Sequence, residues 1–159
     1  MSRIAIIGAG AWGTAIAIVL GRRGDHTVRL WAHETEVCDS INRLHVNQLF
    51  LADCPIPASV SATNSLEEAL RDADIVVSVM PSHHTRRVFS AMLPHLHAGT
   101  LFVSATKGIE NDTLLRMSAV IADVLGPLSP RIGALSGPTF AKEVALGQPT
   151  ALTIASIDK

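Results

Sequence analysis

The sequence lacks features that mark several classes of protein. It has no tyrosine, and aromatic residues make up only 4% of its 159 residues. Its 13 lysines and arginines are balanced by 14 aspartates and glutamates, so the net charge of −1 gives no indication of a nucleic-acid or anionic membrane partner. No apolar run approaches the roughly 20 residues that a membrane-spanning helix needs. We therefore expect no nucleic acid and no membrane span.

Cysteine is also scarce. Cys38 and Cys54 stand apart without C-x-x-C spacing, and no signal-peptide pattern precedes the first apolar run. A cytoplasmic protein with reduced thiols is the simplest interpretation. The histidines that lie close in sequence are His83, His84, His95 and His97. No cysteine or carboxylate cluster at ligand spacing accompanies them, so we expect no metal site.

Charged residues are few, at 17%, while hydrophobic residues make up 48%. This composition suits strands that are buried on both faces of a parallel sheet. It equally suits a protein with one apolar face that a partner covers. The length corresponds to one domain or a little more, which is enough to bury a core without disulfides.

Three glycines near the amino terminus, Gly8, Gly10 and Gly13, have the spacing G-x-G-x-x-G. An apolar run typical of a buried strand precedes them at 4–7, and an apolar, alanine-rich helical segment follows at 14–20. In this context one glycine allows a tight turn, the second lets the backbone approach a pyrophosphate, and the third lets helix and strand pack closely. The free N–H groups of the helix favour an anion there. The motif predicts a dinucleotide site.

The rest of the chain alternates between strand and helix patterns. We expect strands at 27–31, 59–63, 75–80, 101–105, 131–135 and 148–156, and helices at 34–44, 64–71, 86–93 and 111–125. The turn-prone segment 45–57 is expected to be irregular, and Pro138 is expected to lie in the start of a short helix. The pattern predicts an α/β, Rossmann-type, doubly wound fold over 1–159, with a mostly parallel sheet and helices on both faces.

Residues that follow strands are candidate ligand contacts, because ligands of open α/β sheets lie beyond the carboxyl ends of the strands. Pro81 follows one strand, and a plain strand-to-helix turn would use similar residues. Lys107 follows the next strand and is well placed to meet a phosphate or a carbonyl oxygen, although lysines are common on any surface.

The choice between NAD and NADP stays open at this stage. An acidic residue about 20 positions beyond the glycines commonly binds the adenosine ribose hydroxyls of NAD. Glu34 lies at that distance but beyond the expected strand end, while His33 beside it could face a 2′-phosphate or be a solvated loop residue.

Several motifs in order suggest a family. They are GAGAWGTA at 8–15, N-x-x-F-L at 47–51, VMPSH at 79–83, ATKGIE at 105–110 and SGPTFAKEVA at 136–145. Together they resemble bacterial NAD(P)-dependent glycerol-3-phosphate dehydrogenase over essentially the whole chain. The resemblance implies reversible reduction of dihydroxyacetone phosphate to sn-glycerol 3-phosphate, for glycerophospholipid synthesis.

The resemblance also implies roles for single residues. Ala11, Trp12, His33 and Ala141 would contact the dinucleotide, Gly137 and Thr139 the substrate, and Lys107 both. Trp12 could otherwise be a packing residue at the start of the first helix.

One part of the family's pattern is missing. The family has a second, mostly helical domain that carries a proton-exchanging lysine, and neither Lys142 nor Lys159 matches the motif of that lysine. We therefore expect a cofactor-binding domain without the catalytic residue. Two alternatives are another Rossmann dehydrogenase that acts on a hydroxy acid, and a non-catalytic nucleotide-sensing module. A homodimer also stays open.

Overall fold

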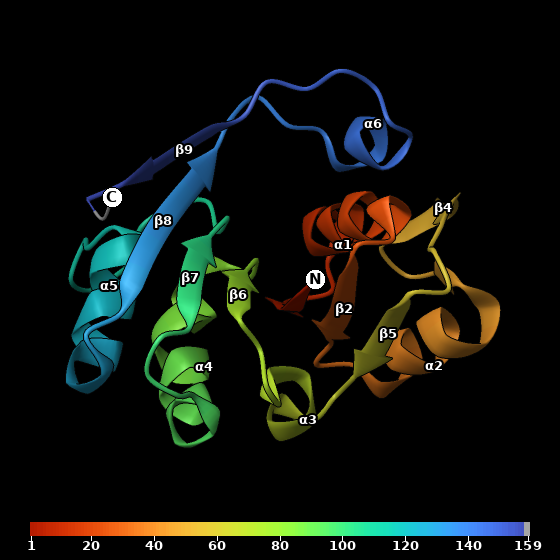
Figure 1. Ribbon diagram of the computed structural model, residues 1–159. Helices are drawn as coiled ribbons and strands as arrows, with labels where there is room; N and C mark the ends of the chain where they lie inside the picture. The colour runs from red at the N-terminus through yellow and green to blue at the C-terminus, as the bar shows by residue number, and fades with distance from the viewer. Residues whose placement is uncertain (158–159) are drawn as a thin grey trace.

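The computed structural model describes residues 1–157, and its centre is a seven-stranded sheet. Its strands are β1 (Ser2–Ile7), β2 (His26–Trp31), β5 (Val60–Thr63), β6 (Ile75–Ser78), β7 (Leu101–Ser104), β8 (Arg131–Ser136) and β9 (Thr153–Ser156). Their order is β5-β2-β1-β6-β7-β8-β9, and every neighbouring pair is parallel except β8 and β9 (Figure 1). The first six strands have the Rossmann order, so the predicted fold class is confirmed.

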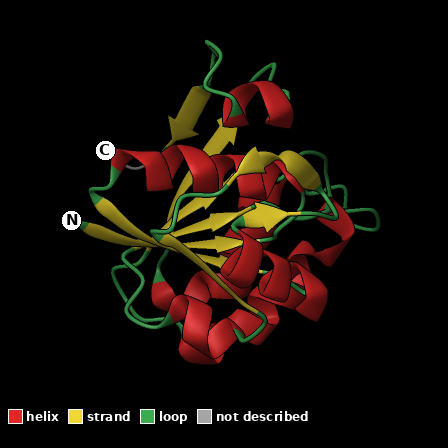
Figure 2. Cartoon of the chain, turned by 90° about the vertical axis from the view of Figure 1, so that its right-hand side faces the viewer, coloured by secondary structure: helices red, strands yellow, loops and turns green. Residues whose placement is uncertain are grey.

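Helices cover both faces of the sheet (Figure 2). The helices are α1 (Ala11–Arg23), α2 (Thr35–Leu44), α3 (Leu66–Leu70), α4 (Thr85–Met92), α5 (Met117–Leu125) and α6 (Ala141–Ala145), with short 3-10 turns η1 (Ser82–His84), η2 (Leu93–His95) and η3 (Gly126–Leu128). Side chains of β1 alternate between the two faces. Ile4 and Ile6 pack in a core with α1, α2 and α6, whereas Ala5 and Ile7 pack with α3, α4 and α5.

The connection between β2 and β5 holds more structure than the sequence predicts. Instead of an irregular segment over 45–57, it forms an antiparallel pair, β3 (Val46–Asn47) and β4 (Leu51–Pro55). Within this pair Asn47, Leu51 and Cys54 are buried, because β4 packs against α1 and β3 against α2. The prolines and polar residues in the segment therefore belong to a packed hairpin.

Other predicted boundaries are wrong for local reasons. The helix expected over 111–125 begins only at Met117, because Leu114 has a φ of 57° and Ile109 forms a β-bridge with Arg116. Pro138 lies outside a helix, since α6 begins at Ala141. The strands expected at 75–80, 101–105 and 148–156 are shorter than predicted. Within residues 1–157, no helix combines the length and apolar character needed to cross a membrane.

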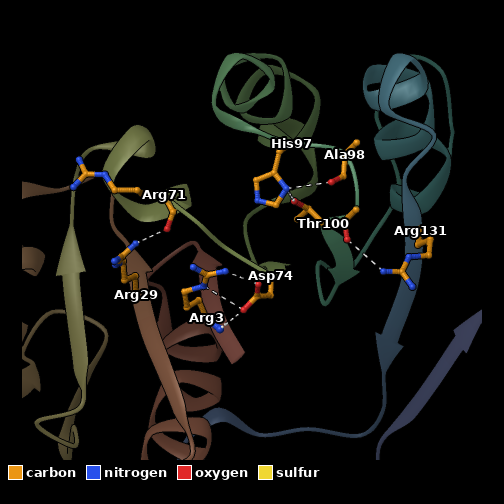
Figure 3. Close-up of polar contacts among 9 residues, drawn as sticks. Arg3, Arg29, Arg71, Asp74, His97, Ala98, Thr100 and Arg131 are labelled. Carbon is orange, nitrogen blue, oxygen red and sulfur yellow. Dashed lines mark hydrogen bonds and ion pairs between the residues drawn. The ribbon is translucent and has the colours of Figure 1, made fainter. Parts of the chain in front are cut away.

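Polar contacts gather near the edge of the sheet where β1, β6, β7 and β8 begin (Figure 3). The Asp74 carboxylate accepts hydrogen bonds from the Arg3 backbone N–H at 2.8 Å and from the Arg3 guanidinium at 2.9 Å. The Arg131 guanidinium donates to the Gly99 carbonyl at 3.3 Å. These contacts fix the amino ends of the strands. The carboxyl ends, where ligands of open α/β sheets bind, lie on the opposite side of the sheet.

Candidate dinucleotide site

A pocket of about 720 Å³ lies along the carboxyl ends of the parallel strands. All residues predicted to contact the dinucleotide line this one pocket: Gly8, Gly10, Ala11, Trp12, Gly13, His33, Pro81, Lys107 and Ala141. Thr139 also lines it, whereas Gly137 does not. The structure thus brings together residues from five separate stretches of sequence, and their contacts with a ligand stay predictions.

The three glycines of the loop meet different surroundings. A Cβ on Gly8 would lie 2.0 Å from the Val79 carbonyl oxygen, and Gly8 has a φ of +122°. A Cβ on Gly13 would lie 1.9 Å from the Gly8 carbonyl oxygen. Both glycines are therefore required by the protein's own packing. Gly10 has a φ of −67°, and a Cβ there would meet nothing within 4 Å, so space for a ligand is open beside it.

The amino end of α1 has the properties of an anion site. Gly10 is the N-cap residue, and no side chain among residues 1–157 caps the first turn. The first intrahelical bond shown joins the Thr14 N–H to the Gly10 carbonyl at 3.0 Å, so the N–H groups of Ala11, Trp12 and Gly13 have no partner within the helix. These groups and the helix dipole favour a phosphate beside Gly10.

Asn47 holds the glycine loop from the β3–β4 hairpin. Its buried amide Nδ2 donates to the Ala9 carbonyl and to the Thr14 hydroxyl, each at 2.8 Å. Its Oδ1 accepts a hydrogen bond from the Phe50 backbone N–H at 3.1 Å, and the Phe50 side chain lines the pocket. One side chain therefore fixes both the loop and a wall of the pocket.

The ends of β7 and β8 supply the other polar groups. The Lys107 ammonium donates to the Gly137 carbonyl at 3.3 Å, and Thr139 lies nearby in the pocket wall. A Cβ on Gly137 would lie 2.4 Å from the Ala151 carbonyl oxygen, so packing alone accounts for this glycine. In this structure the Gly137 carbonyl holds the Lys107 ammonium, and the substrate contact expected of Gly137 stays a prediction.

The end of the pocket beyond β2 carries several titratable groups. His33 and Glu34 follow β2, and His84 and Arg87 lie at the start of α4. Partial burial lowers the pKa of His84, and the charges of His83, Arg87 and His33 lower it further. Sequence reasoning did not select His84, Arg87 or Phe50. No sequence signal distinguishes Arg87 from Arg86 or His84 from His83, since both pairs follow Pro81 with the same i, i+3 spacing.

No metal centre is found among the described residues, 1–157, which contain no group of three or more histidines, cysteines or carboxylates placed to share an ion. Cys38 and Cys54 are buried free thiols, and burial raises the pKa of Cys38. The pocket therefore offers backbone N–H groups, cations and apolar surface, which together suit an anionic dinucleotide.

Comparison with known sequences gives consistent matches. A sequence model of the family described as NAD-dependent glycerol-3-phosphate dehydrogenase N-terminus matches residues 3–159. A protein of Koribacter versatilis named glycerol-3-phosphate dehydrogenase (NAD(P)+) is 64% identical over 100% of this chain and 48% of its own length. Its namesake in Acidobacterium capsulatum is 48% identical over 99% of this chain and 48% of its own length. The chain thus spans about half the length of these relatives.

Solved structures agree. A glycerol-3-phosphate dehydrogenase of Coxiella burnetii superposes with a TM-score of 0.91 at 35% identity, over 99% of this chain and 47% of its own. The corresponding enzyme of Saccharomyces cerevisiae superposes with a TM-score of 0.85 at 27% identity, over 98% of this chain and 47% of its own. A 3-hydroxyisobutyrate dehydrogenase of Mycobacterium tuberculosis shares the fold alone, with a TM-score of 0.69 at 18% identity over 99% of this chain and 46% of its own.

Proposed function

We propose a function from one premise: the chain belongs to the NAD-dependent glycerol-3-phosphate dehydrogenase family. Residues 1–159 form the dinucleotide-binding domain of an enzyme that interconverts dihydroxyacetone phosphate and sn-glycerol 3-phosphate with NAD(P)(H). The product would serve glycerophospholipid synthesis. The alternative hydroxy acid dehydrogenase has less support, because such an enzyme shares only the fold with this chain.

The observation that carries the proposal is the open space at Gly10. Gly8 and Gly13 are needed for packing, but neither the backbone angles of Gly10 nor its surroundings exclude a side chain. A glycine that the fold itself does not need suggests a ligand that approaches the backbone closely. The uncapped amino end of α1 beside it is a suitable partner for a pyrophosphate.

When bound, a nicotinamide dinucleotide supplies or accepts the hydride. The chain's own groups would bind the dinucleotide and orient the substrate. The N–H groups of Ala11 and Trp12 would hold the pyrophosphate, and the apolar wall of Met80 and Val88 would exclude water from one side of the pocket. Lys107, with its ammonium at the ends of β7 and β8, would attract the substrate phosphate or polarise its carbonyl oxygen.

Proton exchange with the substrate oxygen is assigned to residues outside this chain. Lys107 is engaged with the Gly137 carbonyl, and Lys142 donates to the Asp53 carboxylate at 2.6 Å. The Asp53 carboxylate raises the pKa of Lys142, which makes it a poorer proton donor. The Koribacter versatilis relative is matched over only 48% of its length, and the group that exchanges the proton would lie in the half of that relative that this chain does not cover.

The test has a binding part and a turnover part. Calorimetry with the 159-residue chain should show binding of NADH or NADPH. The chain should then be assayed for oxidation of the reduced dinucleotide with saturating dihydroxyacetone phosphate, beside the full-length Koribacter versatilis relative. Binding with turnover lower by at least ~10²-fold, the contribution of a positioned acid or base, is expected. Equal turnover would place the acid–base group within this chain, and binding without turnover in either protein would favour a nucleotide-sensing module.

A further inference from the structure

The pocket contains a cation that the fold does not use. Arg87 lies in the first turn of α4, after β6, and lines the pocket together with His84, His33 and Glu34. The neighbouring Arg86 is fully engaged, since it donates to Glu110 at 2.8 Å and to Asp123 at 2.5 Å. No ion pair or hydrogen bond of the Arg87 side chain is found within residues 1–157. Arg87 is thus an exposed cation in the lining of the pocket, without an ion pair or hydrogen bond to that part of the chain.

The position of Arg87 does not help the helix. Cations in the first turn oppose the helix dipole, and the first turn of α4 contains no acidic residue that would compensate. A stabilising role in α4 therefore does not account for an arginine at this place. Recognition of an anionic ligand in the pocket does.

Other titratable groups in the lining of the pocket are His33, Glu34 and His84. The charges of Arg87 and His33 both lower the pKa of His84, so each of them lies close enough to His84 to interact with it, and all three residues line the same pocket. Because that pKa falls below its ordinary value of 6.5, His84 is mostly neutral at pH 7. Arg87 thus provides the permanent positive charge at this end, and the carboxylate of Glu34 opposes it.

The place of the group relative to the sheet indicates which part of a dinucleotide it meets. In Rossmann domains the adenosine ribose lies beyond the end of the second strand, and an arginine near that point accommodates a 2′-phosphate. His33 and Glu34 directly follow β2, so this is the adenosine end. The amino end of α1 would bind the pyrophosphate, so Arg87 is not needed for that part of the ligand.

We propose that Arg87 determines coenzyme specificity by pairing with the 2′-phosphate of NADP(H), with His33 beside it, and that it offsets the repulsion from Glu34. The inference rests on the proposed function, because it requires a dinucleotide in this pocket. It assigns a role to a side chain of α4, an element that belongs neither to the glycine loop nor to β2 but contributes to the same pocket. A planar guanidinium can contact two phosphate oxygens at once, which a lysine cannot.

The experiment uses two isomeric probes, adenosine 2′,5′-bisphosphate and adenosine 3′,5′-bisphosphate, which differ only in the position of one phosphate. Calorimetry would compare the parent chain, Arg87→Gln and the matched control Arg43→Gln. Arg43 is exposed on α2 and does not line the pocket. Arg87→Gln should weaken binding of the 2′,5′ isomer and of NADPH by roughly tenfold or more, the value of a charge-assisted hydrogen bond. Binding of NADH should change by less than about threefold, and Arg43→Gln should change neither.

Two further variants test whether charge and donor geometry at this end of the pocket determine the affinity for NADPH. Arg87→Lys should recover part of the NADPH affinity, because it keeps the charge but loses the fork of donors. Glu34→Gln should raise the affinity for NADPH by removing a repulsive carboxylate. The melting temperature of Arg87→Gln should equal or exceed that of the parent, since a cation is removed from a helix amino end.

The outcomes separate this inference from the proposed function. Equal weakening of both isomers by Arg87→Gln would mean general attraction of anions or stacking on adenine, and would overturn the inference. Binding of NADH but not NADPH by the parent would overturn it as well, while leaving the proposed function intact. Binding of neither dinucleotide would refute the proposed function itself.

Discussion

Substitution of Gly10 should affect the affinity for the dinucleotide without affecting the stability of the fold. Its φ of −67° and ψ of −177° are ordinary extended angles, and a Cβ would meet no atom within 4 Å. Removing a glycine at compatible angles stabilises a protein by about 0.4–1 kcal/mol through the unfolded state. An alanine at the N-cap is poorer than glycine by a similar amount, so the two effects nearly cancel. Gly10→Ala and Gly10→Val should therefore fold normally.

Binding should respond differently. A side chain at Gly10 would stand where a pyrophosphate must approach the amino end of α1. Hydrogen bonds to a charged group contribute about 1.5–3 kcal/mol each, and loss of one such bond corresponds to roughly 10- to 150-fold in affinity. Gly10→Val should lose at least this much for both NADH and NADPH, because the pyrophosphate is common to them.

Gly13→Ala is the matched control. The added Cβ would lie 1.9 Å from the Gly8 carbonyl oxygen, so backbone must move. Overpacking of this kind costs typically about 1–3 kcal/mol, which for a protein of this size lowers the melting temperature by very roughly 2–12 °C. Differential scanning fluorimetry and calorimetry would measure both properties. If Gly10→Val lost as much stability as Gly13→Ala, or kept the parent's affinity, the division of roles between these glycines would be wrong.

Three further predictions concern other parts of the chain. Asn47→Ala should lower both stability, by about 1–3 kcal/mol, and NADH affinity, because the buried Ala9 carbonyl loses its 2.8 Å donor and keeps only the longer bond from the Thr14 hydroxyl at 3.4 Å. Denaturant unfolding and calorimetry measure the two effects. Arg3 lowers the pKa of Asp74 to about 2, so the ion pair is intact above about pH 4 and lost as pH falls toward 2. The difference in melting temperature between the parent and Asp74→Asn should therefore shrink over that window, and a constant difference would contradict this. Lys107→Met should weaken sn-glycerol 3-phosphate binding to the NADH-loaded chain by roughly tenfold in calorimetry, with an unchanged melting temperature, since its bond to a carbonyl is exposed.

The parts of the fold that sequence could predict are those with a local signal. The strand, glycine loop and helix at the amino terminus follow from apolar runs and glycine spacing, and so does the alternation that produces the parallel sheet. The residues expected at strand ends meet in one pocket, because the carboxyl ends of parallel strands share an edge.

The parts that sequence could not predict depend on contacts between distant residues. The segment before α5 turns instead of continuing as helix, where Glu110 accepts hydrogen bonds from Arg86, 24 positions away. Arg87 has no sequence feature that distinguishes it from Arg86. In the structure, however, Arg87 lines the pocket, whereas Arg86 forms an ion pair with Glu110. The hairpin at β3 and β4 was not predicted, because its prolines and polar residues favour turns locally. Its buried residues Asn47, Leu51 and Cys54 instead pack it against the rest of the domain, including α1.

The bond network of Asn47 has a consequence for the energetics of ligand capture. A phosphate-binding loop that is mobile in the free protein must be ordered when its ligand arrives, and that loss of freedom lowers the affinity. Here a buried side chain 38 positions along the chain already holds the Ala9 carbonyl at 2.8 Å. The ordering of the loop therefore takes place during folding, and the entropy is not lost a second time on binding. It follows that a G-x-G-x-x-G sequence transplanted without its Asn47 would keep the glycines but not the full affinity.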